Sequence, residues 1–148
     1  MKSIHLFFYF LVLIGFQSCQ DNNDIITFHK SHEPSRANVP FSDAVETDDF
    51  LFLTGQIGKN HTTGELVSGG IKAETRQVIK NIQDVLEYHN LSLDQVVKCT
   101  VILKDISEFK DFNSVYIQYF TNKPARTTFA AAGLAGGASI EIDVIAAK

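Results

Sequence analysis

The segment SIEIDVIAA, residues 139–147, alternates branched apolar residues with acids, and this alternation constrains the fold more than any other feature of the chain. Successive side chains of a β-strand point to opposite faces, so the apolar residues share one face while Glu141 and Asp143 share the other. Other elements must cover the apolar face, whereas the acidic face must meet solvent or another subunit. The segment therefore predicts a sheet that helices cover on one face.

Two other segments have helical periodicity. Residues 71–88 place apolar side chains on one face of a helix and polar ones on the other, and Asn90 is a plausible left-handed stop. The apolar positions are Val78, Ile79, Ile82, Val85 and Leu86. A second helix is predicted after Asp105, an N-cap residue that forms a capping-box pattern with Glu108. Its apolar stripe is Phe109, Phe112, Tyr116 and Phe120.

The remaining apolar runs predict strands. Residues 41–45 and 50–57 flank Asp48 and Asp49 and predict a hairpin. Further strands are expected at residues 25–30, 96–104 and 125–131, and in residues 96–104 one face is expected to hold Val97, Cys99, Val101 and Leu103. The order is strand, hairpin, helix, strand, helix, strand, strand. This order predicts an α+β fold, one mixed sheet covered on one face by two helices.

The N-terminal residues are expected to stand apart from this fold. Lys2 precedes an apolar run, residues 4–16, that is too short for a membrane span and has the layout of a signal peptide. Cys19 follows a small residue and resembles the lipidated cysteine of bacterial lipoproteins; an ordinary secretory signal or an uncleaved anchor is the alternative. The expected organisation is a signal peptide (1–18), a polar tether (19–25) and one domain (26–148). The protein is then expected to lie outside the cytoplasm, anchored by lipid to a bacterial membrane.

Composition limits the partners. The 148 residues include 13 basic and 17 acidic ones, a net charge of −4, so no basic footprint for nucleic acid is present. With Cys19 lipidated, Cys99 would have no partner for an internal disulfide. His29 and His32 are interpreted as a surface pair and not as metal ligands, and no pattern calls for a cofactor.

Three features could carry chemistry. Arg126 lies in NKPARTTFAAAG, a stretch of low charge, and its planar guanidinium matches a carboxylate in two parallel hydrogen bonds. Glu141 is a charge within an apolar strand, and Gly55 of LTGQIG permits close approach of a ligand to the backbone. The alternatives are a surface arginine paired with an acid, a solvated strand carboxylate and, at Gly55, a bulge or a simple strand end. Taken singly, these residues leave the choice open.

Together the motifs resemble the reactive intermediate deaminase family, also called RidA-like or endoribonuclease L-PSP-like. The resemblance covers residues 39–147 and is carried by VPFSDAV, LFLTGQIG, TGELVSGGIKAETRQVIKNI, VVKCTVILKDISEFKDFNSVYIQYF and PARTTFAAAGLAGGASIEIDVIA. It implies a chorismate-mutase-like fold and a homotrimer with clefts between subunits. It also implies hydrolysis of 2-imino and 2-enamino acids to 2-keto acids and ammonia, without a metal or cofactor.

The resemblance also implies roles for single residues. Arg126 would bind the substrate carboxylate, and Glu141 would position or activate water. The other positions implied for the cleft are Phe41, Thr54, Gly55, Asn113 and Thr128. Phe41 stands where tyrosine is common, which removes a hydroxyl from the pocket, and Thr128 stands where cysteine is common.

Two other functions are alternatives. One is a non-catalytic trimeric module that binds a small carboxylate, which would need Arg126 but not Glu141. The other is ribonuclease activity, which the acidic balance and the lack of a phosphate-binding stripe disfavour. The expected partners are therefore a small imine or enamine carboxylate and other copies of the chain.

Overall fold

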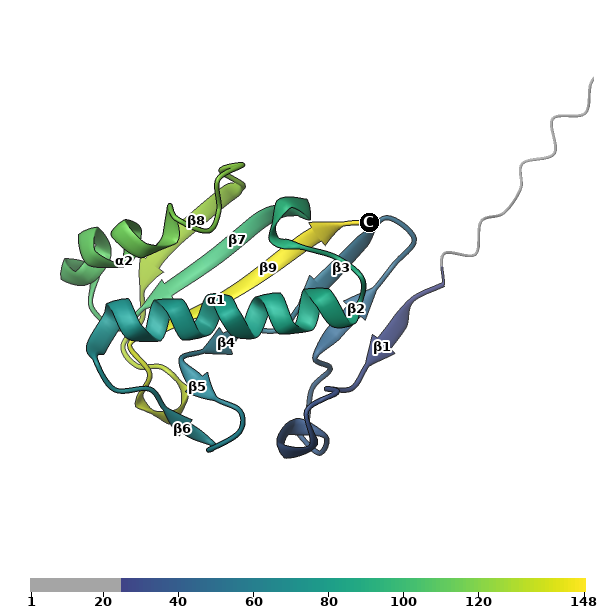
Figure 1. The fold of residues 1–148 in the computed structure, drawn as a ribbon, viewed down its shortest axis with the longest axis horizontal. Helices are drawn as coiled ribbons and strands as arrows, with labels where there is room; N and C mark the ends of the chain where they lie inside the picture. The colour runs from purple at the N-terminus through teal and green to yellow at the C-terminus, as the bar shows by residue number, and fades with distance from the viewer. Residues whose placement is uncertain (1–24) are drawn as a thin grey trace, which may run out of the picture.

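Residues 25–148 are described by a computed structural model, in which one large sheet carries two helices on one face (Figure 1). The strand order is β1-β2-β3-β9-β7-β8, and β4 also pairs with β9. The strands are β1 (Thr27–His29), β2 (Ala44–Glu46), β3 (Phe50–Leu53), β4 (Gln56–Ile57), β7 (Val96–Leu103), β8 (Ala125–Ala130) and β9 (Ile140–Ala147). Strands β7 and β8 run parallel, whereas the other pairs of this sheet run antiparallel. The predicted α+β fold with a mixed sheet is therefore confirmed.

Helix α1 (Gly70–Tyr88) crosses the sheet, and α2 (Phe109–Tyr116) lies beside it near β7 and β8 (Figure 1). The buried face of α1 packs against β9, as the helical period of residues 71–88 predicts. The chain leaves α1 through Asn90, whose φ of 60° is the predicted left-handed stop. A small ribbon of β5 (Lys59–Asn60) and β6 (Glu65–Leu66) follows β4.

Strand β9 shows the predicted alternation. Ile140, Ile142 and Val144 are buried on the helix side, whereas Glu141 and Asp143 are half-buried on the other face. That other face is not covered by a helix of the described chain, and it also carries partly exposed aromatic side chains. These are Phe28, Phe50, Phe52 and Phe129. An apolar surface of this kind on a folded chain is typical of an interaction site.

The structure corrects two local predictions. A register shift between Val96 and Lys98 places Val96 in the core and leaves Val97 43% exposed, so Val97 does not share the face of Cys99. Asp105 does cap a turn, by accepting from the Ser107 N–H at 2.8 Å. That turn is a 3₁₀ helix (Ile106–Glu108), and α2 begins after it, so the capping box predicted with Glu108 does not begin an α-helix there.

Candidate active site

Arg126 lies on the edge strand β8, and its side chain points to the helix side of the sheet. It pairs in register with Cys99 of β7, which is buried on that side. The guanidinium carbon lies 4.5 Å from the ring centroid of Tyr116 and 5.2 Å from that of Phe112. These rings hold the cation over their faces by cation–π attraction. Within residues 25–148 no acidic side chain forms an ion pair with Arg126, so its N–H groups are available to an external anion.

A pocket of about 590 Å³ opens beside this arginine. It is formed by α2, by the segment after it and by the start of β8, and it brings the predicted residues Asn113 and Arg126 together. Lys110 and Lys123 also line it, and none of its lining residues is acidic. The three cations create a positive potential that favours a small anion such as a carboxylate. We call this the arginine pocket.

Glu141 lines a second pocket, of about 540 Å³, together with Phe41, Thr54 and Gly55. Strand β4 holds this arrangement, because Ile57 pairs in register with Glu141. The predicted cleft residues from three parts of the chain are therefore brought together here. We call this the glutamate pocket.

The environment of Glu141 favours its protonated form. Burial raises the pKa of the Glu141 carboxyl above its ordinary value, and the charge of Asp143 on the same strand face raises it further. Burial raises the pKa of Asp143 as well, although hydrogen bonding by Thr100 and the Lys98 charge oppose the shift. A carboxylate with a raised pKa is a stronger base than an ordinary one, which suits the abstraction of a proton from water.

The strand that carries Glu141 is fixed at its start by a buried acid of α1. Glu74 accepts hydrogen bonds from the Ser139 N–H at 2.8 Å and from the Ser139 hydroxyl at 2.6 Å. Ser139 immediately precedes β9, so these bonds set the position at which β9 begins. A side chain on a strand that is held in this way has little freedom to move, as a functional geometry requires.

Gly55 is a close backbone neighbour of the Glu141 carboxylate. A Cβ atom at residue 55 would overlap Glu141 Oε1 and lie 2.9 Å from Glu141 Cδ. The Gly55→Ala substitution is therefore expected to push the carboxylate from its position and to lower the rate of a reaction that uses this carboxylate by up to about 100-fold, since misplacement by about 1 Å can have that effect. Gly133→Ala is the matched control, because a Cβ there meets no atom within 4 Å. Equal rates for the two variants would show that this contact does not matter.

A single chain keeps the arginine and the acid apart. Arg126 pairs with Cys99 of β7, and Glu141 pairs with Ile102 of the same strand. Cys99 and Ile102 are three positions apart on β7, so their side chains, and those of their partners, point to opposite faces of the sheet. Arg126 and Glu141 therefore lie in different pockets of one chain.

Thr128 is the one predicted residue that lines neither pocket. It pairs in register with the buried Val101, which places its side chain on the helix side with Arg126. Its hydroxyl oxygen is buried and has no hydrogen-bond partner among the described residues.

A buried polar network beside the glutamate pocket was missed by sequence reasoning. Arg36 forms an ion pair with Asp43 at 2.7 Å and donates to Gln56 Oε1 at 3.2 Å. Asp43 and Gln56 are each 2% exposed. The network joins the irregular segment before Phe41 to the sheet, and so positions one wall of the pocket. These three residues are separated in the sequence by seven or more positions, and no local motif indicates that their side chains are in contact.

The comparison with protein families decides the identity. A family model described as Endoribonuclease L-PSP matches residues 31–148, which include every candidate residue of the two pockets. The chain belongs to this family. We call it the Endoribonuclease L-PSP (RidA) family.

Relatives within the Endoribonuclease L-PSP (RidA) family are similar over most of their length. A RutC family protein of Pyrococcus horikoshii is 46% identical over 110 residues, which are 74% of this chain and 87% of that protein. Human 2-iminobutanoate/2-iminopropanoate deaminase is 42% identical over 108 residues, 72% of this chain and 79% of the human protein. The crystal structure of RidA from an Antarctic Psychrobacter has a TM-score of 0.76 at 32% identity, covering 82% of this chain and 99% of that one.

The comparisons overturn the predicted localisation. Members of the family occur in human, yeast and an archaeon, and the family model matches none of the N-terminal residues on which the prediction of an exported, lipid-anchored protein rested. No helix within residues 25–148 is long and apolar enough to cross a membrane. The relatives in human, yeast and an archaeon contradict the assignment to the outside of a bacterial cell, which is wrong. Cys19, the signal peptide predicted for residues 1–18 and residues 19–24 of the tether lie outside the described residues.

Proposed function

We propose that the chain hydrolyses 2-imino and 2-enamino acids to 2-keto acids and ammonia, with Arg126 binding the substrate carboxylate and Glu141 acting on water. The observation that carries this proposal is the pair of complementary pockets, one with three cations and no lining acid, the other with a half-buried carboxylate of raised pKa. Three mammalian relatives that are 36–42% identical are named 2-iminobutanoate/2-iminopropanoate deaminase. Both the geometry and these names support the same reaction class.

The two pockets would be joined between chains. Arg126 and Glu141 lie on opposite faces of one sheet, so one chain cannot apply both to a small substrate. The open face of the sheet carries exposed aromatic side chains beside Glu141 and Asp143, as a face buried between subunits would. Packing of such faces around a threefold axis would bring the arginine pocket of one chain to the glutamate pocket of its neighbour.

The reaction needs little beyond binding and proton transfer. The arginine pocket would orient the substrate through its carboxylate, in the two-bond geometry that a guanidinium favours. Glu141 would take a proton from water as the water oxygen attacks the C=N carbon, and would pass that proton to the nitrogen, which gives a carbinolamine. The hydroxyl proton of the carbinolamine would then move by way of Glu141 to the amino group as the C–N bond breaks and the C=O bond forms, which releases ammonia and leaves the keto acid. Orientation and general acid–base assistance supply the acceleration.

Mixing two inactive variants tests the shared site. In an assembly with shared sites, Arg126→Ala and Glu141→Gln chains that are refolded together form some sites with both native residues. Random mixing of equal amounts makes about one quarter of the sites native, so the mixture should regain about one quarter of wild-type activity. Activity is measured as keto acid released from 2-iminobutanoate that an amino-acid oxidase generates in the presence of catalase.

The outcomes separate the alternatives. Activity of the wild type without recovery in the mixture would contradict a site shared between chains. A wild type that does not accelerate keto-acid release, but that binds 2-ketobutanoate through Arg126, would instead favour the non-catalytic carboxylate-binding module. Refolding each variant alone is the control, because neither should regain activity without the other.

A further inference from the structure

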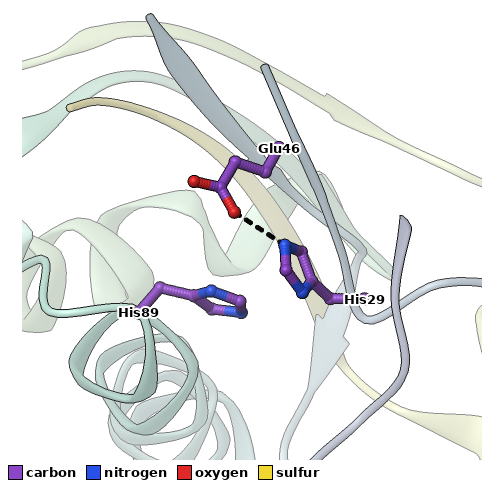
Figure 2. A group of neighbouring side chains, drawn as sticks. All are labelled: His29, Glu46 and His89. Atoms are coloured by element: carbon purple, nitrogen blue, oxygen red, sulfur yellow. Dashed lines mark hydrogen bonds and ion pairs between the residues drawn. The ribbon is translucent and has the colours of Figure 1, made fainter. Parts of the chain in front are cut away.

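Three side chains far apart in the sequence converge at the C-terminal end of α1. Figure 2 shows His29 and Glu46 in direct contact, with the ring of His89 turned toward them. His29 Nε2 lies 2.7 Å from Glu46 Oε2, and the centroids of the two imidazole rings are 4.5 Å apart. One ligand atom from each residue lies within 4.8 Å of the other two. The sequence pattern grouped His29 with His32, but His32 instead stacks on Tyr88.

The fold positions each member of this cluster on a different element. In the antiparallel pair of β1 and β2, His29 is opposite Ala44 and Glu46 is opposite Thr27, so His29 and Glu46 are diagonal neighbours on one face. Ala44 is buried, which identifies that face as the helix side of the sheet. His89 directly follows α1, so the end of the helix brings its ring over the two strands. The side chains of His29 and Glu46 are 26% and 29% exposed, which leaves the cluster open to a small ion.

Two imidazoles and one carboxylate form a donor set that transition metals favour. Zn²⁺ is bound by His nitrogen and Glu oxygen at about 2.0–2.2 Å, and sites with three protein ligands keep a fourth position for water. We propose that His29, Glu46 and His89 form a binding site for a divalent transition-metal ion of the zinc class. Ligand atoms around such an ion are about 3.3 Å apart, so the present separations need only small side-chain rotations. His29 would present to the ion its Nε2 atom, which lies 2.7 Å from Glu46 Oε2.

One neighbouring cation competes with this ion. Lys148 Nζ lies 2.6 Å from Glu46 Oε1, whereas Glu46 Oε2 is the oxygen that faces His29. A bound dication would therefore share Glu46 with the Lys148 ammonium and be repelled by it. Removal of the Lys148 ammonium should therefore tighten metal binding. If Lys148 only supported the fold, its removal would weaken metal binding instead.

The metal would join the edge strand β1 to β2 and to α1. None of the three residues lines the glutamate pocket, and the cluster lies on the helix side of the sheet, whereas Glu141 lies on the other face. A metal that binds the folded chain better than the unfolded chain raises its thermal stability. The site is therefore expected to be structural and independent of the proposed deaminase chemistry.

Calorimetric titration of the full-length, chelator-treated protein with ZnCl₂ tests the proposal. The wild type should bind Zn²⁺ saturably, and Zn²⁺ should raise its melting temperature. His29→Ala and His89→Ala should weaken binding by about 100-fold or more, since loss even of a residue that supports a ligand weakens a site by about 10- to 100-fold. His32→Ala is the matched control, because His32 is a nearby histidine outside the cluster, and it should bind like the wild type.

The Lys148→Ala variant tests the proposal without removing any of the three proposed metal ligands. It should bind Zn²⁺ several-fold more tightly than the wild type, and circular dichroism should confirm that each variant is folded. Three results would overturn the proposal: no saturable binding by the wild type, equal weakening by His32→Ala and His29→Ala, or weaker binding by Lys148→Ala.

Discussion

Replacement of Arg126 by alanine is expected to lower kcat/KM for 2-iminobutanoate by about 30- to 5,000-fold, because the loss of one partner from a desolvated charge pair costs about 2–5 kcal/mol and each 1.36 kcal/mol is a factor of ten. The guanidinium is held over the Tyr116 and Phe112 rings and has no acidic partner within residues 25–148. Because no acid of the described residues pairs with Arg126, the substrate carboxylate would be the anion that this guanidinium binds. Steady-state keto-acid release at several imine concentrations measures the effect.

Two further variants make this result specific. Arg126→Lys keeps the charge but cannot form two parallel hydrogen bonds, so it should recover only part of the loss. Arg76→Ala is the matched control, because Arg76 is exposed on α1 and donates to the Lys72 carbonyl oxygen. An Arg126→Ala enzyme as fast as Arg76→Ala would rule out Arg126 as the carboxylate-binding residue.

The Glu141→Gln substitution is expected to lower kcat by about 100- to 10,000-fold, the range that general acid–base assistance contributes. Glutamine keeps the size of the side chain but cannot accept a proton from water. Because the pKa of Glu141 is raised above 4.5 by burial and by Asp143, wild-type kcat should fall on acidification through a midpoint above 4.5. This acid limb should be missing from the residual rate of Glu141→Gln. An unchanged pH profile in the variant would assign the limb to another group.

The same substitution should affect stability in the opposite direction. The folded state holds the Glu141 proton more tightly than the unfolded chain does, so the stability contributed by this carboxyl is present below pH 4.5 and falls as the pH rises toward the raised pKa. Glu141→Gln should therefore have a higher melting temperature than the wild type at neutral pH, with the difference vanishing in acid. A destabilised variant at neutral pH would mean that the charged form is paired in the assembled protein.

Much of the fold followed from local pattern. The alternation in β9 and the helical period of α1 could be seen in the sequence because each pattern repeats several times along its element. The structure confirms both patterns. The two local errors arose where one residue changes the register. A bulge at Val97 reverses the expected face, and Asp105 caps a 3₁₀ turn where an α-helix was expected. Single-residue shifts of this kind depend on tertiary pairing, which periodicity does not report.

Resemblance named the candidate residues and implied clefts between subunits, but it did not show how one chain divides these residues between two pockets. The sequence motifs name Arg126 and Glu141 without showing that they occupy opposite faces of one sheet. The Arg36 network and the His29 cluster were also missed, because each joins residues that no local spacing relates. Contacts between distant segments are set by strand register and by where a helix ends, and these become visible only in three dimensions.

With the proposed site shared between chains, the opposed placement of Arg126 and Glu141 would link catalysis to protein concentration. A lone chain could be correctly folded and still have no turnover, because its Arg126 would have no Glu141 of a neighbouring chain beside the same substrate. Dilution below the association threshold would then switch the enzyme off reversibly while its circular dichroism spectrum stayed the same.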